Sequence, residues 1–201
     1  MSGQYQPRDR YFHKAKEQGY RARSVFKLEE IQDRFHLIRP GDKVLDLGAA
    51  PGSFMQFILE VIGERGLIIG VDLQPIKSFS DARAKTYVGD IFDEKIYEQI
   101  AKDTGRTVFD VVTSDLAPST SGIKFVDAGR SFDLNSRAIE VARQHLKPNG
   151  HLLLKAFPGE DHSKLIAEAK TLFWQVKVAK PAAVRETSRE EYIVCLGKKP
   201  N

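Results

Sequence analysis

Two short segments in the first half of the chain carry residues that could bind a nucleoside. An apolar run from Val44 ends in the turn Gly48 to Gly52, and a second apolar run ends 20 residues later at Asp72. Glycine permits a tight turn into a helix, whose free N–H groups then face a ligand. A carboxylate at the end of the next strand can accept hydrogen bonds from both ribose hydroxyls. The pattern predicts a site for a dinucleotide or for S-adenosylmethionine.

The spacing of the glycines favours the second of these cofactors. A dinucleotide site normally reads G-x-G-x-x-G, whereas Gly48 and Gly52 are separated by three residues and no third glycine follows in register. Pro51 lacks the N–H group that a pyrophosphate would use. A cofactor without phosphates therefore fits better, and a strand, turn and helix with no ligand is the remaining alternative.

A second group of residues could carry out proton chemistry. Asp115 and Lys155 stand at the ends of apolar runs, Glu190 stands just before the last apolar run, and Lys27 lies in the first amphipathic segment. Residues just past the carboxyl ends of parallel strands converge on one crevice, so the first three should share its mouth and Lys27 could cover it. Taken singly, each is better explained as a helix cap or a surface charge, but the four together favour a shared site.

The elements that must position these residues follow from the hydrophobic periodicity, which alternates between strand-like and helix-like segments. It predicts a Rossmann-like α/β fold: a mostly parallel seven-stranded sheet, helices on both faces and a C-terminal antiparallel hairpin. Expected strands lie near 43–47, 67–71, 84–88, 108–114 and 150–156, with the hairpin near 174–180 and 190–197. Expected helices lie near 24–35, capped by Ser24, and near 53–63, 92–103, 129–147 and 161–172.

Composition narrows the class of protein. The 201 residues, 41% apolar and 29% charged, suit a single domain with a sizeable core. One cysteine, Cys195, excludes a disulfide framework and is expected to be a buried strand thiol. No signal peptide and no apolar run of about 18 residues is apparent, so we expect a cytoplasmic monomer without membrane contact. The five histidines lack ligand spacing, and no metal is expected.

The positive charge belongs to an N-terminal arm, residues 1–27, ahead of a catalytic domain at 28–201. The arm holds seven Lys or Arg against two acids, a net +5, while the whole chain carries +4. Its basic residues are Arg8, Arg10, Lys14, Lys16, Arg21, Arg23 and Lys27, interleaved with Tyr11, Phe12, Tyr20 and Phe26. Basic and aromatic residues in alternation suit RNA, with His13 as a possible contact; the alternative is a solvated terminus.

The polar segment Pro118 to Asp133 is predicted to be a loop beside the site, either closing over a substrate or simply connecting two elements.

In the order and spacing of its motifs the chain resembles the FtsJ/RrmJ (RlmE) ribosomal RNA ribose 2′-O-methyltransferases over nearly its whole length. The motifs are Tyr11-Phe12-His13, Gly19 to Leu28, Asp46 to Gly52, Ser114 to Pro118, Val126-Asp127 and Ser188 to Val194. The resemblance implies a catalytic tetrad of Lys27, Asp115, Lys155 and Glu190, in which Glu190 and not Glu191 is the member. It also implies that S-adenosylmethionine contacts Gly52, Phe54, Asp72, Asp90 and Asp115, with Phe54 in place of the family's usual tryptophan.

This resemblance implies 2′-O-methylation of a uridine in large-subunit ribosomal RNA, on the assembled 50S particle, with Lys155 as the proton acceptor. That role needs a neutral amine, which burial or the neighbouring Lys27 favours and Asp115 opposes. Lys155 could instead only orient the hydroxyl, with Glu190 fixing the lysine's position. Other substrates within the class are tRNA and an mRNA cap. From other classes, an NAD-dependent oxidoreductase and a non-catalytic ribosome-assembly factor are the alternatives.

Overall fold

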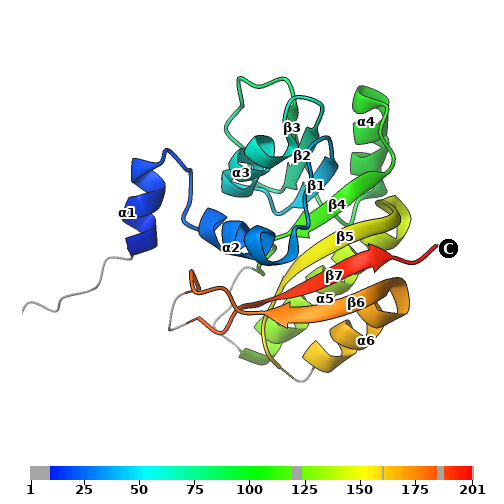
Figure 1. Ribbon diagram of the computed structural model, residues 1–201. Helices are drawn as coiled ribbons and strands as arrows, with labels where there is room; N and C mark the ends of the chain where they lie inside the picture. Colours follow the sequence, from blue (N-terminus) through cyan, green and yellow to red (C-terminus); the bar gives the residue numbers. More distant parts are fainter. Residues whose placement is uncertain (1–9, 119–123, 160, 185–187, 201) are drawn as a thin grey trace, which may run out of the picture.

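The computed structural model describes residues 10–118, 124–159, 161–184 and 188–200, with residues 124–128 described by their backbone alone. Arg8, residues 119–123 and the side chains of Val126 and Asp127 therefore lie outside the description. Within it, seven strands form one sheet in the order β3-β2-β1-β4-β5-β7-β6. Figure 1 shows this sheet between two layers of helices.

The strands and helices follow the predicted order. The strands are β1 Lys43–Leu47, β2 Leu67–Asp72, β3 Ala84–Val88, β4 Phe109–Ser114, β5 Leu146–Ala156, β6 Phe173–Ala179 and β7 Glu191–Lys198. The helices are α1 Arg10–Glu17, α2 Val25–Phe35, α3 Ser53–Ile62, α4 Glu94–Thr104, α5 Lys124–His145 and α6 His162–Leu172. The Rossmann-like fold and the C-terminal antiparallel hairpin are confirmed. No helix among the described residues combines the length and the apolar surface needed to span a bilayer.

The register of the sheet brings the chemically relevant strand ends to one edge. Leu47 at the end of β1 pairs with Val71 of β2 and with Ser114 of β4. Strands β1 to β5 pair in parallel, so their carboxyl ends meet there. The antiparallel β7 begins at the same edge, because its Tyr192 lies opposite Lys155 of β5. One edge thus carries the ends of the parallel strands and the start of β7.

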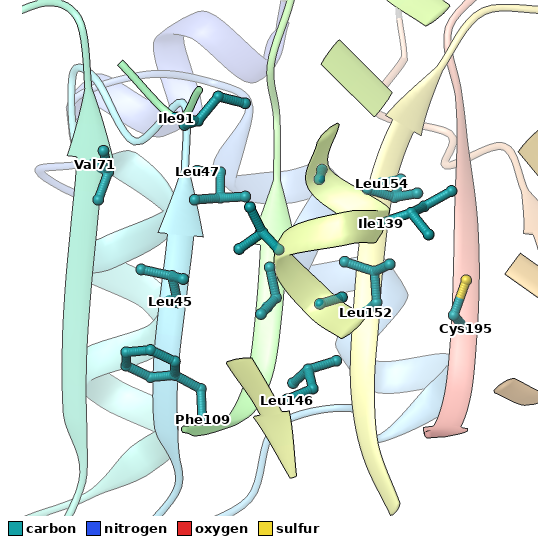
Figure 2. Packing of buried hydrophobic residues seen from close by; sticks show 14 of the residues in the cluster. Leu45, Leu47, Val71, Ile91, Phe109, Ile139, Leu146, Leu152, Leu154 and Cys195 are labelled. Atoms are coloured by element: carbon teal, nitrogen blue, oxygen red, sulfur yellow. The ribbon is translucent and has the colours of Figure 1, made fainter. Parts of the chain in front are cut away.

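Alternating side chains along the strands divide the core into two apolar layers. Leu45 and Leu47 of β1 pack with α4, α5 and α6, whereas Val44 packs with α1, α2 and α3. Figure 2 shows the first layer, in which Ile139 of α5 lies among Leu152, Leu154 and Cys195. Cys195 is fully buried in β7, as expected, and burial raises the pKa of its thiol.

Three local expectations are corrected by the structure. Helix α1 is absent from the predicted elements, because its apolar side is small and Ala15 is its one buried residue. Helix α5 begins at Lys124, so the predicted loop from Pro118 to Asp133 is wrong from residue 124 onward. A buried position within that segment is the polar Ser131, so the apolar periodicity of the helix is weak there. Ser24 makes no side-chain cap; its Oγ lies 2.9 Å from Ser53 Oγ instead.

A buried carboxyl group underlies the functional edge of the sheet. Asp46 of β1 is fully buried, and its Oδ1 accepts a 2.6 Å hydrogen bond from Thr113 Oγ1. Its Oδ2 has no partner among the described residues. Burial raises the pKa of Asp46 to about 8, and the nearby Asp115 and Asp72 carboxylates act in the same direction. Asp46 is therefore mostly protonated at neutral pH.

We predict that Asp46→Asn flattens the pH dependence of the unfolding free energy. The folded-state pKa of about 8 lies above the value of about 3.9 for an unfolded aspartate, so the folded protein holds this proton more tightly. The stability that this proton contributes is present below about pH 4 and is lost as the pH rises toward 8. Between about pH 5 and pH 8, the free energy of unfolding measured with urea should fall further in the wild type than in Asp46→Asn, by on the order of 1–3 kcal/mol. Equal losses in the two proteins would contradict a protonated Asp46.

Candidate active site

A cavity of about 780 Å³ opens at the carboxyl edge of β1, β2, β3 and β4. Its walls come from the glycine turn, the segment after β2, the segment after β3, the segment after β4 and the first half of α5. The lining residues are Gly48, Ala50, Val71, Asp72, Leu73, Gln74, Gly89, Asp90, Ile91, Phe92, Asp115, Leu116, Ala117, Pro118, Arg130, Asp133 and Leu134. Four of these are aspartates, so the cavity suits a ligand that carries hydroxyl, amino or cationic groups.

One wall is built by the glycine turn and Asp72. Gly48 has a φ of +74°, and a Cβ there would lie 2.9 Å from Leu116 Cδ2, so both the backbone angle and the space require glycine. Asp72 Oδ2 accepts a 2.9 Å bond from the Ala50 N–H, and Oδ1 accepts a 2.8 Å bond from the Gln74 N–H. These two bonds join the turn to the segment after β2 and fix the direction of the Asp72 carboxylate.

The opposite wall, residues 90–92, is held from behind by two helices. The carbonyl of Ile91 accepts a 2.9 Å bond from the Tyr97 hydroxyl of α4 and a 2.8 Å bond from Arg137 Nε of α5. Arg137 also pairs with Glu94 at 2.6 Å. Asp90 Oδ1 accepts a 3.0 Å bond from the Phe92 N–H. The wall that presents Asp90 is therefore fixed by side chains outside the cavity.

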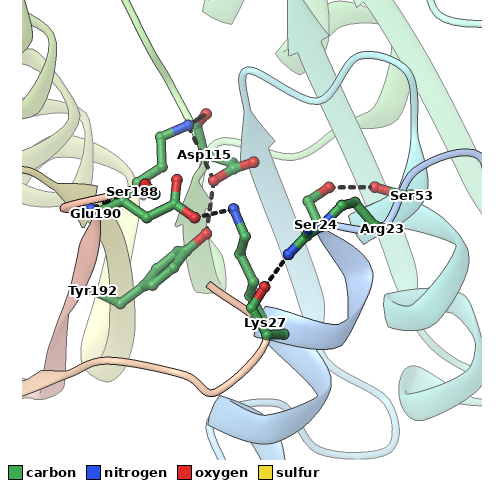
Figure 3. A network of polar contacts seen from close by, with 10 residues as sticks. Arg23, Ser24, Lys27, Ser53, Asp115, Ser188, Glu190 and Tyr192 are labelled. Carbon is green, nitrogen blue, oxygen red and sulfur yellow. Dashed lines mark hydrogen bonds and ion pairs between the residues drawn. The ribbon is translucent and has the colours of Figure 1, made fainter. Parts of the chain in front are cut away.

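Beside the cavity the four predicted tetrad residues come together as two ion pairs. Lys155 Nζ donates to the Asp115 carbonyl at 2.5 Å and lies 3.2 Å from Asp115 Oδ1. Lys27 of α2 forms an ion pair with Glu190, which directly precedes β7. Figure 3 shows Asp115, Lys27 and Glu190 converging from three separate parts of the chain. Both lysines are buried, at 9% exposure for Lys27 and 7% for Lys155.

Tyr192 is a member of this network to which the sequence patterns assign no role. Its hydroxyl donates a 2.8 Å hydrogen bond to Asp115 Oδ1, and its side chain is fully buried opposite Lys155. Burial, and then the Asp115 carboxylate, raise the pKa of Tyr192 well above its ordinary value, so it remains a donor at neutral pH. The feature that could have identified Tyr192 is the register between β5 and β7, which places Tyr192 directly opposite Lys155. Glu191 instead points to His162, with which it pairs.

The residues predicted to bind the cofactor divide into two groups. Asp72, Asp90 and Asp115 line the cavity. Gly52 and Phe54 are not among its lining residues: Phe54 is 3% exposed and packs in the α1–α3 apolar layer. Gly52 is the N-cap of α3, with a φ of +104°. In this structure both residues shape the turn behind the cavity wall.

Within the described part of the chain, no cluster of three or more His, Cys, Asp or Glu could hold a metal ion.

The basic arm is also divided. Arg21 donates three hydrogen bonds to backbone carbonyls of two loops, and Arg23 donates to the carbonyl of Ala183. Lys27 belongs to the site described above. Over residues 10–27 this leaves a set of exposed basic side chains on α1, namely Arg10, Lys14 and Lys16. Arg21, Arg23 and Lys27 therefore make contacts within the protein, whereas the basic side chains of α1 face solvent.

Comparison with known proteins places the chain in a family. The sequence profile of the FtsJ-like methyltransferases matches residues 20–198. The ribosomal RNA large subunit methyltransferase E of Syntrophobacter fumaroxidans is 46% identical over 94% of this chain and 95% of its own length. The enzyme of the same name from Bdellovibrio bacteriovorus is 44% identical over 97% of this chain and 99% of its own.

Solved structures agree in fold. The crystal structure of a ribosomal RNA methyltransferase candidate from Plasmodium falciparum is 25% identical and has a TM-score of 0.81, covering 90% of this chain and 100% of that chain. Aeropyrum pernix fibrillarin, solved with bound S-adenosyl-L-methionine, is 19% identical with a TM-score of 0.57, covering 80% of this chain and 68% of that chain. With a profile match over most of its length and relatives of more than 40% identity, this chain belongs to the FtsJ-like methyltransferase family.

Proposed function

We propose that this protein uses S-adenosylmethionine to methylate the ribose 2′-hydroxyl of a uridine in large-subunit ribosomal RNA. The observation that carries the proposal is the pair of buried lysine–carboxylate contacts, Lys155 with Asp115 and Lys27 with Glu190, beside an acid-lined cavity. Asp115 belongs to both the cavity wall and the lysine network, so one residue adjoins cofactor and acceptor. Membership in a methyltransferase family excludes the oxidoreductase alternative.

The cavity fits the cofactor. A volume of about 780 Å³ lies in the range of small-molecule sites, and its four lining aspartates suit a ligand with two ribose hydroxyls, an adenine amino group and a positively charged amino acid end. Asp72 would accept from the ribose hydroxyls, Asp90 would lie near the adenine amino group, and Asp115 near the methionine end. Gly52 and Phe54 would contribute by shaping the turn. The bound cofactor supplies an electrophilic methyl group on a positively charged sulfur.

The chain's own residues then act on the ribose. Lys155 holds the 2′-hydroxyl by hydrogen bonding and accepts or directs its proton, while Asp115, which itself accepts a hydrogen bond from Tyr192, fixes the lysine from one side. The Lys27–Glu190 pair closes the other side of this network. Correct placement of the two reacting groups is worth up to about 7–11 kcal/mol, so a rigid lysine matters as much as its basicity. These steps require no metal.

RNA would be bound by the exposed side of α1, within the N-terminal arm. Arg10, Lys14 and Lys16 are exposed, and so is Phe12 at 56%, with His13 packed edge-on against it at 5.7 Å between ring centroids. Cations hold phosphates without regard to sequence, and an exposed aromatic ring can stack on an unpaired base. Such a surface recognises the shape of folded RNA, which favours the assembled 50S particle as the substrate. The proposal places this reaction in the cytoplasm and takes the protein to act as a monomer.

The experiment that tests the proposal is transfer of labelled methyl from S-adenosylmethionine to 50S particles lacking the modification, to free ribosomal RNA and to tRNA. Nuclease mapping then identifies the labelled nucleotide. A 2′-O-methyluridine in large-subunit RNA, formed fastest on the particle, is the expected result. Label on tRNA alone would overturn the substrate, and bound cofactor without any transfer would support a non-catalytic assembly factor.

We predict that Lys155→Met strongly slows methyl transfer and leaves S-adenosylmethionine affinity within a few-fold of wild type. Methionine fills a similar volume but neither holds nor deprotonates the hydroxyl, so kcat should fall by roughly 10²–10⁴-fold, the range for removing a proton-transfer group. Single-turnover assays and calorimetric titration of the cofactor measure the two quantities. Near-normal turnover in the variant would remove Lys155 from the mechanism.

We predict that Tyr192→Phe lowers kcat by roughly 10-fold, with little change in KM for the cofactor. The variant removes the hydroxyl that donates to Asp115 Oδ1, and a hydrogen bond to a charged group is worth about 1.5–3 kcal/mol. The matched control is Tyr87→Phe, which removes a hydroxyl from β3, away from the lysine network. Equal effects of the two variants on kcat would mean that the Tyr192 hydroxyl serves stability alone.

We predict that Arg10→Glu combined with Lys16→Glu weakens RNA binding and lowers its salt dependence. Removing one phosphate contact should reduce the slope of log affinity against log salt by about 0.7–0.9. The control is Lys95→Glu with Lys102→Glu, the same charge change on exposed positions of α4, on the opposite face of the sheet. Filter binding at several salt concentrations measures both slopes, and identical slopes for the two double variants would contradict an α1 interface.

A further inference from the structure

Arg21 joins two loops that lie next to each other behind the cavity. Its Nη1 donates to the carbonyls of Pro51, at 3.1 Å, and Lys77, at 2.7 Å, and its Nη2 donates to Ser78 at 3.0 Å. The guanidinium also stacks on the Phe79 ring, 3.9 Å from its centroid. Three carbonyls and one aromatic face thus hold this side chain.

Both loops form part of the cavity wall. Pro51 belongs to the glycine turn, and residues 73–83 connect β2 to β3, with Leu73 and Gln74 lining the cavity. Asp72, which stands between them, bonds to the Ala50 N–H on one side and the Gln74 N–H on the other. Arg21 therefore bridges, from outside, the same two loops that Asp72 bridges from inside.

The backbone of Arg21 is itself anchored to α3, the helix that follows the glycine turn. Gln56 Oε1 accepts a 2.8 Å bond from the Arg21 N–H, and Gln56 Nε2 donates a 3.0 Å bond to the Gly19 carbonyl. The space around the guanidinium is filled: a Cβ on Gly52 would lie 2.5 Å from Arg21 Nη1. The arm thus delivers a pre-positioned guanidinium to the back of the turn.

We propose that Arg21 is a positioning residue for the cofactor site and not a phosphate ligand for RNA. By tying residues 77–78 to the glycine turn, it holds the segment after β2 in the position that aims Asp72 and Gln74 at the cavity. This inference rests on the proposed cofactor, S-adenosylmethionine. Its physical basis is the planar guanidinium fork, which can serve several carbonyls at once, whereas a lysine ammonium on a flexible stem is a point charge without that geometry.

The two roles for Arg21 make opposite predictions for Arg21→Lys. A phosphate contact tolerates lysine, because the charge is kept. The guanidinium contacts that join the two loops do not, because a lysine ammonium has neither the planar fork that reaches all three carbonyls nor a flat face to stack on Phe79. We expect Arg21→Lys and Arg21→Gln to raise both the calorimetric Kd and the KM for S-adenosylmethionine by roughly 10-fold, the effect of about 1.4 kcal/mol. At saturating cofactor, kcat and the salt slope of RNA binding should stay near wild type.

The control is Arg34→Gln, which removes an exposed guanidinium from α2 and should leave the cofactor Kd unchanged. A second measurement needs no cofactor: amide hydrogen exchange at residues 49–52 and 74–80 should be faster in Arg21→Lys than in the wild type. Cofactor affinity within twofold of wild type, or unchanged exchange in these two segments, would overturn the inference. If the wild type does not bind S-adenosylmethionine, the proposed function fails, whereas the exchange result still decides the positioning role.

Discussion

The site depends on the hydrogen bonds that fix Asp115. Its N–H donates to the Leu47 carbonyl at 3.2 Å, its own carbonyl accepts from Lys155, and its carboxylate accepts from Tyr192. These contacts come from β1, β5 and β7, so one residue joins three strands at the edge where the cavity opens. Because Asp115 also lines the cavity, any displacement of it would disturb cofactor and acceptor geometry together.

Burial of the two lysines adds a second constraint. An unpaired buried charge costs several kcal/mol, so Lys27 and Lys155, both buried in the folded protein, require their carboxylate partners. Each partner comes from another part of the chain. Lys27 of α2 pairs with Glu190, which directly precedes β7, and Lys155 of β5 pairs with Asp115, which directly follows β4. The charged site therefore forms only when α2 and the C-terminal hairpin are both in place, which links its assembly to the complete sheet.

Sequence patterns predict those features that depend on periodicity and on strand ends. Alternation locates the strands, and a parallel topology gathers Asp115, Lys155 and Glu190 at one edge. The same patterns do not predict Tyr192, because its role depends on the β5–β7 register. They place the start of α5 about five residues too late, near 129 instead of Lys124, because the preceding segment is rich in Ser, Thr and Gly, which favour turns over helices. They also do not predict that Phe54, expected to contact the cofactor, is buried in the apolar layer that includes α2.

The basic arm shows why a count of charges does not measure an interface. Its described Lys and Arg residues have three different surroundings: exposed on α1, bonded to backbone carbonyls, or buried against Glu190. A guanidinium that already serves three carbonyls gains little from a phosphate, because the new contact must replace bonds already made. The net charge of residues 1–27 therefore overstates the charge available to RNA. The same segment places Arg21 behind the cavity and Lys27 in the lysine network, so it contributes more to the candidate site than its composition suggests.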